Sequence, residues 1–221
     1  FAQTHGPLLA KLEELAKRLQ AGITLCAVYD QPSSGQSVLR DLSEQLRDST
    51  NEDLEQEVEE VRSSYPEVAI QTKSIQGDTA EMIAKLAELE KADLIVMGKT
   101  GRSGFSNKLF GSVALKTIAE TDHPVLLIPQ DWKYKDITKI CLATDLSDFN
   151  YPKVLDPLMR FARLYSAPVE LLHFAEDQEA LDELYNNGAE AKKQIEQTLA
   201  EIPHRFAFGI ERNVRKAIFD H

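Results

Sequence analysis

Apolar and polar residues follow one another along the chain in blocks that alternate between the period of a helix and that of a strand. Residues 7–20 repeat leucine every three or four positions, which is typical of a helix with one buried face. Residues 23–29 (ITLCAVY) form a continuous apolar run, which predicts a strand buried in a parallel sheet. The alternation continues with predicted helices over 36–63, 80–92 and 112–120, and predicted strands over 68–75, 92–98 and 124–129.

A polar linker (QDWKYKD, 130–136) interrupts this series, and the pattern then restarts. It predicts strands over 137–145, 167–174 and 204–210, and helices over 151–165 and 178–200. Residues 16–30 match residues 162–177 in pattern, so the restart is an internal repeat. We predict an α/β protein with doubly wound parallel sheets, in two tandem domains at 1–130 and 137–221.

Composition narrows the classes of partner. The 25 basic and 36 acidic residues give a net charge of -11, which argues against broad binding to nucleic acid or anionic lipid. No apolar run is long enough to span a membrane. The acidic stretch between Asp41 and Glu60 predicts a solvated helix face, with a docking surface for a basic partner as the alternative. Cys26 and Cys141 lie in apolar runs and are expected to be reduced, buried thiols of a cytoplasmic protein.

The stretch after the strand at 92–98 carries the candidate chemistry. Its spacing is Gly98-x-x-Gly101, nine residues, and then Gly111-Ser112. It is neither a P-loop nor G-x-G-x-x-G. Gly98 follows a parallel strand at the sheet edge where ligands bind, and Gly111-Ser112 opens a helix whose amides favour an anion. Three cationic residues add local positive charge, namely Lys99, Arg102 and Lys108. The pattern indicates a phosphate site, but a glycine-rich surface loop with Ser112 as a plain helix cap explains it equally well.

A family resemblance favours the phosphate site. Val-Met-Gly-x-x-Gly, nine residues and Gly-Ser, followed by a helix and His123-Pro-Val-Leu-Leu-Ile-Pro, closely resembles the nucleotide-binding branch of the universal stress protein family. The restart at KICLATDLSDFNYPKVLDPLMRFARLYSAPVELLHF resembles the first strand, helix and second strand of that family. The likeness covers nearly the whole chain as two tandem copies, and it is stronger in the first. It implies a Rossmann-like fold with strand order 3-2-1-4-5 in each copy.

The resemblance also implies a set of residues that bind ATP or another adenine nucleotide. Phosphate and ribose contacts fall on Gly98, Gly101, Gly111, Ser112 and Val113. Val28 and Met97, near the ends of two strands, would lie close to adenine, and Asp145 has the place of an acidic residue near base and ribose, although in the second copy. A Mg²⁺ ion beside the nucleotide is conceivable because Asp145, Ser147 and Asp148 lie together, but capping is the commoner role of such residues at a strand-to-helix junction.

Both copies depart from the family pattern. The first begins without the strand that precedes its first helix, and the second ends before its own glycine segment. We expect either that the sequence is part of a longer tandem protein, or that the partial copies complement each other and bring Asp145 to the glycine segment.

The function expected from these features is that of a cytoplasmic, homodimeric, ATP-binding sensor or switch of the stress response. The five histidines are scattered without metal-ligand spacing, and no nucleophile–base pair accompanies the glycine segment, so we expect slow ATP hydrolysis at most. One alternative is a dimerisation or interaction module that binds no nucleotide, with the strand PVLLIP mediating dimerisation. An adenine-nucleotide hydrolase is the third possibility.

Overall fold

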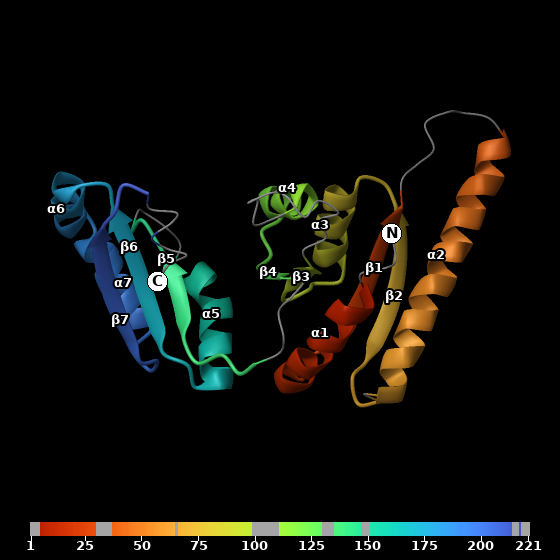
Figure 1. Ribbon diagram of the computed structural model, residues 1–221, viewed down its shortest axis with the longest axis horizontal. Coiled ribbons are helices and arrows are strands. Elements are labelled where there is room, and N and C mark those ends of the chain that lie inside the picture. Colours follow the sequence, from red (N-terminus) through yellow and green to blue (C-terminus); the bar gives the residue numbers. More distant parts are fainter. Residues whose placement is uncertain are drawn as a thin grey trace. The chain divides into compact units, whose positions relative to one another are not determined.

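The computed structural model describes residues 5–29, 37–64, 66–98, 111–129, 135–146, 151–213 and 217. The chain divides into two compact units, Phe1–Tyr134 and Lys135–His221, and each is described by itself. Both units alternate helices and strands (Figure 1). Within the described ranges, no helix combines the length and the apolar character needed to cross a bilayer.

Eight elements make up the described part of the first unit. They are α1 (His5–Leu19), β1 (Ile23–Tyr29), α2 (Ser37–Ser64), β2 (Ile70–Gln76), α3 (Thr79–Leu89), β3 (Ile95–Gly98), α4 (Ser112–Glu120) and β4 (Val125–Ile128). The second unit contributes β5 (Ile140–Ala143), α5 (Tyr151–Tyr165), β6 (Val169–Ala175), α6 (Gln178–Asn187), α7 (Ala189–Thr198) and β7 (His204–Ile210).

All strand pairs among these elements are parallel. In the first unit β1 pairs with β2 and β3 pairs with β4, as two separate two-stranded sheets. In the second unit β6 lies between β5 and β7. Parallel neighbours require a crossover connection, and the two strands of each hydrogen-bonded pair here are joined through a helix. The predicted α/β fold with parallel sheets is therefore confirmed.

The long helix α2 packs along β2 in the first unit. Leu54 and Val58, four residues apart on one helix face, are buried, and Val58 joins a core cluster with Val68 and Ile70. Burying a side chain of this kind contributes about 1.5–3 kcal/mol. Side-chain hydrogen bonds to β2 lie beside this contact, including one of 2.7 Å from the Thr72 hydroxyl to the Glu55 carboxylate.

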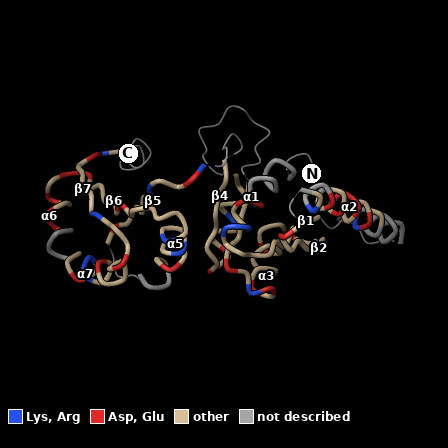
Figure 2. The backbone as a smooth tube through the Cα atoms, turned by 90° about the horizontal axis from the view of Figure 1, so that it is seen from below, with Lys and Arg blue, Asp and Glu red and all other residues tan. Residues whose placement is uncertain are grey.

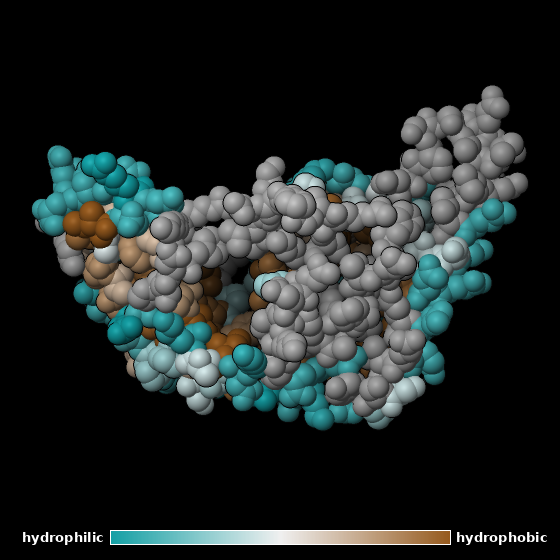
Figure 3. All heavy atoms as spheres, viewed as in Figure 1, coloured by the Kyte–Doolittle hydropathy of each residue, from teal (hydrophilic) through white to brown (hydrophobic). Residues whose placement is uncertain are grey.

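The opposite side of α2 is polar and solvated. The described acidic residues of its central part are exposed, and Figure 2 shows them distributed along the helix. Figure 3 shows the same hydrophilic surface on the described part of α2. The prediction that this acidic run forms a solvated helix face is confirmed.

The core of the second unit lies between the sheet and the helices α5 and α7. Val169 and Leu171 alternate along β6 and meet Leu155 from α5 and Ile195 from α7, all four at 1% exposure or less. The strand at β6 and the helix residues of α5 and α7 lie where the sequence pattern predicted strand and helix.

One predicted helix is two helices in the structure. The sequence pattern predicted a single helix over 178–200, whereas α6 ends at Asn187 and α7 begins at Ala189. Gly188 lies between them as the N-cap of α7, with φ -86° and ψ 0°. Glycine is a poor helix former because it loses the most backbone entropy, so the break falls at this residue.

The expected burial of both cysteines was wrong for Cys141. Cys26 is half-buried, and burial raises the pKa of its thiol to about 11. Cys141 is exposed, because Ile140 and Leu142 turn toward the core and the residues between and after them face the other side of β5. Both cysteines are unpaired thiols.

Candidate nucleotide-binding site

The ends of β1 and β3 carry three of the predicted site residues. Val28 lies next to the last residue of β1, and Met97 and Gly98 end β3. All three are half-buried. Carboxyl ends of parallel strands are the edge at which open α/β sheets bind ligands. The structure therefore places these residues at the kind of edge that the prediction required.

The N-cap residue of α4 is a glycine, so it supplies no side-chain cap of its own. Gly111 is the N-cap residue, in an extended conformation with φ -70° and ψ 157°, and Ser112 is the first helical residue. The first hydrogen bond of the helix runs from the Leu115 amide to the Gly111 carbonyl, at 3.1 Å. The earlier amides of the helix have no intrahelical acceptor and lie at the positive end of its dipole. Ser112 is thus not the plain helix cap of the alternative interpretation, and Val113 beside it is 41% exposed.

The N-terminus of α3 is closed by a carboxylate. Asp78 is its N-cap, and one carboxylate oxygen accepts a hydrogen bond of 3.2 Å from the Glu81 amide. The other oxygen lies 2.8 Å from the Lys116 ammonium on α4. The Lys116 hydrogen bond, followed by the Glu81 amide, holds the pKa of Asp78 below its ordinary value. The N-terminus of α3 is therefore already occupied by a carboxylate, whereas Gly111 brings no such group to α4.

Gly77 joins the ends of β1 and β2 just before this cap. Its amide donates to the Tyr29 carbonyl at 3.1 Å, and its φ of +147° lies in a region that residues with a Cβ rarely adopt. A Cβ on Gly77 would lie 2.9 Å from Cγ of Met82. A short path of contacts thus runs from the end of β1 through Gly77 and Asp78 to Lys116, one turn into α4.

Two predicted site residues are not brought to this place by the described geometry. Gly101 lies outside the described residues, as do the three cations of the glycine segment. Asp145 belongs to the second unit, where it follows β5 and is exposed. Its contact with the nucleotide stays a prediction. Among the residues that the structure describes, no three His, Cys, Asp or Glu side chains are grouped as metal ligands.

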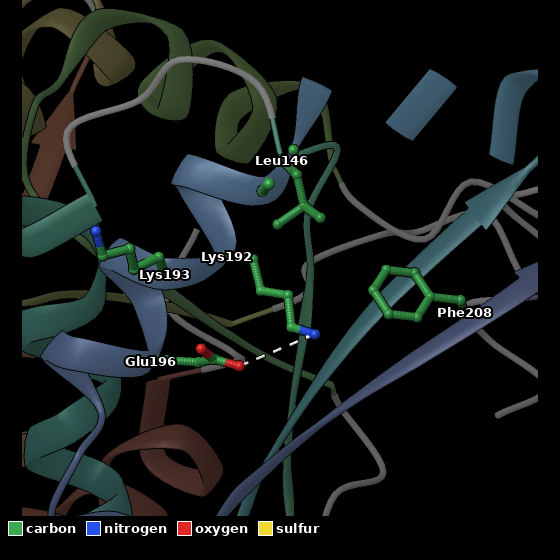
Figure 4. A pocket seen from close by; sticks show the side chains of 7 residues that line it. Leu146, Lys192, Lys193, Glu196 and Phe208 are labelled. Carbon is green, nitrogen blue, oxygen red and sulfur yellow. Dashed lines mark ion pairs between the residues drawn. The ribbon is translucent and has the colours of Figure 1, made fainter. Parts of the chain in front are cut away.

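The second unit has a small cavity that the sequence pattern did not predict (Figure 4). Its volume is about 270 Å³. It is lined by Leu146, Gly188, Ala189, Lys192, Lys193, Glu196 and Phe208. The Lys192 side chain extends between Phe208 and Glu196, and its ammonium lies 3.9 Å from the Glu196 carboxylate. The only sequence signal for this cavity is Gly188. This glycine separates α6 from α7, and the beginning of α7 carries Lys192 and Lys193.

Comparison with known proteins places these features in a family. The universal stress protein family model matches residues 2–129, more than half of the chain. Universal stress protein MJ0531 of Methanocaldococcus jannaschii is 44% identical over 66 residues, which are 30% of this chain and 39% of that protein. Universal stress protein MJ0577 of the same organism is 28% identical over 92 residues, which are 41% of this chain and 57% of that protein. The chain thus matches less than two thirds of the length of either relative.

A solved structure extends the comparison to the fold. The crystal structure of a universal stress protein from Archaeoglobus fulgidus matches with a TM-score of 0.69, over 99% of this chain and 78% of that chain. At 16% sequence identity this match shows a shared fold. Together with the family match over residues 2–129, it leads to one conclusion: the chain belongs to the universal stress protein family.

Proposed function

We propose that the first unit binds ATP or another adenine nucleotide, and that the protein acts in the stress response as a nucleotide-dependent sensor or switch. The observation that carries this proposal is the N-terminus of α4, whose N-cap residue Gly111 has no side chain with which to cap it. It lies in the glycine pattern whose other described member, Gly98, ends β3. The family and the spacing support a nucleotide as the ligand.

The two ends of the site suit the two ends of a nucleotide. The first amides of α4 would receive the phosphates, because they are donors without an intrahelical acceptor at the positive end of the helix dipole. Val28 and Met97 offer half-buried apolar surface for adenine. Gly98 between them and the phosphates lets the backbone approach the ribose without a Cβ.

Local charge supports an anion despite the net charge of -11. The neighbouring carboxylate of Asp78 is neutralised by Lys116 and occupied by the amide of Glu81, so it does not oppose a phosphate with a bare charge. The glycine segment itself contributes Lys99, Arg102 and Lys108. We propose no dedicated catalytic group, and at most slow hydrolysis; a homodimer, a Mg²⁺ ion and a cytoplasmic location remain parts of the proposal.

An interaction module without a nucleotide is the second candidate. Three apolar side chains of α4 are substantially exposed, with Val113 at 41%, Leu115 at 53% and Ile118 at 44%. Leu115 and Ile118, three residues apart, lie on one face of α4, and exposed apolar residues side by side favour a protein contact. This candidate requires no ligand at Gly111, so nucleotide binding separates the two.

The experiment that tests the proposal is detection of bound nucleotide. The purified protein is denatured, and the released small molecules are identified by mass spectrometry; calorimetric titration with ATP and with inorganic phosphate follows. Released ATP, ADP or AMP in near-stoichiometric amount, with saturable ATP binding, supports the sensor. No released nucleotide and no heat of binding would leave the interaction module. Turnover well above one per minute would favour an enzyme, since typical enzymes turn over about 10 times per second.

A further inference from the structure

We propose that Asp78 and Lys116 are positioning residues of the nucleotide site, which hold α4 in register with the ends of β1 and β2. This inference rests on the proposed function, because it concerns the same site. Neither residue belongs to the glycine pattern, and neither needs to touch the nucleotide. They fix the position of the N-terminus of α4, where the phosphates would bind.

The Asp78 carboxylate is fixed by both of its oxygens. One accepts the hydrogen bond of 3.2 Å from the Glu81 amide, which caps α3. The other pairs with the Lys116 ammonium at 2.8 Å. A single side chain therefore joins the start of α3 to α4, and the two residues are 38 positions apart in the chain.

The carboxylate is also anchored to the sheet. Gly77, directly before it, donates to the Tyr29 carbonyl at the end of β1, and the side chain of Met82 closes the space beside it. Because Gly77 adopts a φ of +147°, the turn has little freedom to relax with another residue. The position of Asp78 is thus set by the ends of β1 and β2.

Through its ion pair with Asp78, Lys116 fixes α4 relative to the ends of β1 and β2, close to the proposed phosphate end of the site. It follows Ser112 by four residues, which is about 6 Å along the helix axis at the standard rise. It also lies 3.8 Å from the Glu120 carboxylate of the same helix, so its ammonium is occupied by two carboxylates. Lys116 is therefore suited to hold the helix rather than to neutralise a ligand.

The first unit needs such a link. The described strands form two separate sheets, so no described backbone ladder aligns α4, which follows β3, with β1. The buried side chains of the two helices are small, namely Ala80 and Ala87 on α3 and Ala114 and Thr117 on α4. The ion pair adds a directional contact between the two helices.

The magnitude of the effect should differ between stability and binding. Both side chains are about half exposed, and exposed ion pairs contribute about 0–1 kcal/mol to stability. A ligand held by several fixed amides is more sensitive, since a bound group must be kept within about 0.5 Å of its productive position. Loss of the pair should weaken ATP binding about fivefold while the fold persists.

The test is a double-mutant cycle on ATP affinity in the full chain, with melting temperature as the second readout. Asp78→Asn keeps the capping oxygen and removes the charge, and Lys116→Met removes the ammonium. Lys85→Met is the matched control, because it breaks a pair with Glu81 within α3 alone. We expect each of the first two variants to raise the Kd for ATP about fivefold, the double variant to raise it no further, and the control to change it less than twofold.

The contrary outcomes are distinct. If Lys116 only supplied positive charge to the phosphates, Asp78→Asn would leave ATP binding unchanged or tighter, and the inference would be overturned while the proposed function stood. Additive losses in the double variant would also overturn it, since the residues would then act separately. If the wild-type protein bound no ATP, both the proposed function and this inference would fail.

Discussion

The Glu170 carboxylate of β6 is buried, and the Lys139 ammonium lies 3.0 Å from it. Arg205 of β7 pairs with the other carboxylate oxygen. Glu170 is 2% exposed at its side chain, whereas Lys139 and Arg205 remain 41% and 71% exposed. The middle strand of the second unit thus carries a buried anion that two solvated cations compensate from the neighbouring chain segments.

This arrangement predicts a sharp dependence of stability on the two cations. Lys139→Met combined with Arg205→Met removes these two counter-charges from the buried carboxylate, and breaking buried pairs in this way costs about 3–5 kcal/mol. Adding Glu170→Leu to that variant should recover most of the loss, because an apolar side chain tolerates the site. Urea unfolding followed by circular dichroism measures the stability of the wild type, the double variant and the triple variant. A double variant as stable as the wild type would contradict the assigned compensation.

Gly209 is expected to be intolerant of any side chain. A Cβ there would lie 2.7 Å from Cε1 of Phe174 on the neighbouring strand β6. Gly209→Ala should therefore destabilise the second unit by about 1–3 kcal/mol, as overpacking does. Phe174→Leu in the same chain should offset part of this loss. The thermal midpoints of the single and double variants show whether Phe174→Leu offsets the loss. Additive losses would argue against a contact between these residues.

Removing the charge of Glu13 is expected to make the folded protein more stable at neutral pH. It is a carboxylic acid of α1 that is 2% exposed, and burial raises its pKa above the ordinary value of 4.5. A raised pKa means that the folded protein binds the proton more tightly than the unfolded chain, so stability falls as pH rises from 4.5 through the raised pKa. Glu13→Gln should therefore be more stable than the wild type at pH 7.

The comparison at low pH is the control for Glu13. Below pH 4.5 the carboxyl is protonated in both states, and the difference between Glu13→Gln and the wild type should shrink toward zero. Denaturant midpoints at several pH values measure the profile. An advantage that is constant from pH 4 to pH 7 would indicate packing rather than charge.

Local signals in the sequence predicted several element boundaries correctly. The strand over 23–29 and the helices over 112–120 and 151–165 have the predicted ends. Glycine and serine at Gly111-Ser112 and the apolar run before Asp30 mark these ends directly. Strands β3 and β5 are shorter than predicted, because the register of their parallel ladders covers only Ile95–Gly98 and Ile140–Ala143.

Contacts between distant segments could not be predicted from these signals. The structure assigns the N-cap of α3 to Asp78. Nothing in the local pattern predicted its ion pair with Lys116, since that contact depends on how α3 packs on α4. The burial of Glu170 was not predicted either, because its partners Lys139 and Arg205 come from two other segments.

The candidate site was predicted only in part. Its position at strand ends and at a helix N-terminus followed from the spacing of Gly98 and Gly111. The exposure of Cys141 was not predicted, because an apolar run does not reveal which of its residues turn away from the core. The same limit applies to the role of Asp145, which depends on a contact beyond its own unit.

The measurement that tests the account most directly is ATP affinity of Gly111→Asp, determined by calorimetry beside wild type and Gly111→Ala. Asp at the N-cap would occupy the first amides of α4 and place a negative charge where the phosphates bind, while it supports the helix. We predict that Gly111→Asp keeps the wild-type melting temperature or exceeds it and loses ATP affinity more than tenfold, about 1.4 kcal/mol or more, and that Gly111→Ala loses much less. Equal ATP affinity in wild type and Gly111→Asp would contradict the account, because it would show that the N-terminus of α4 does not hold the nucleotide.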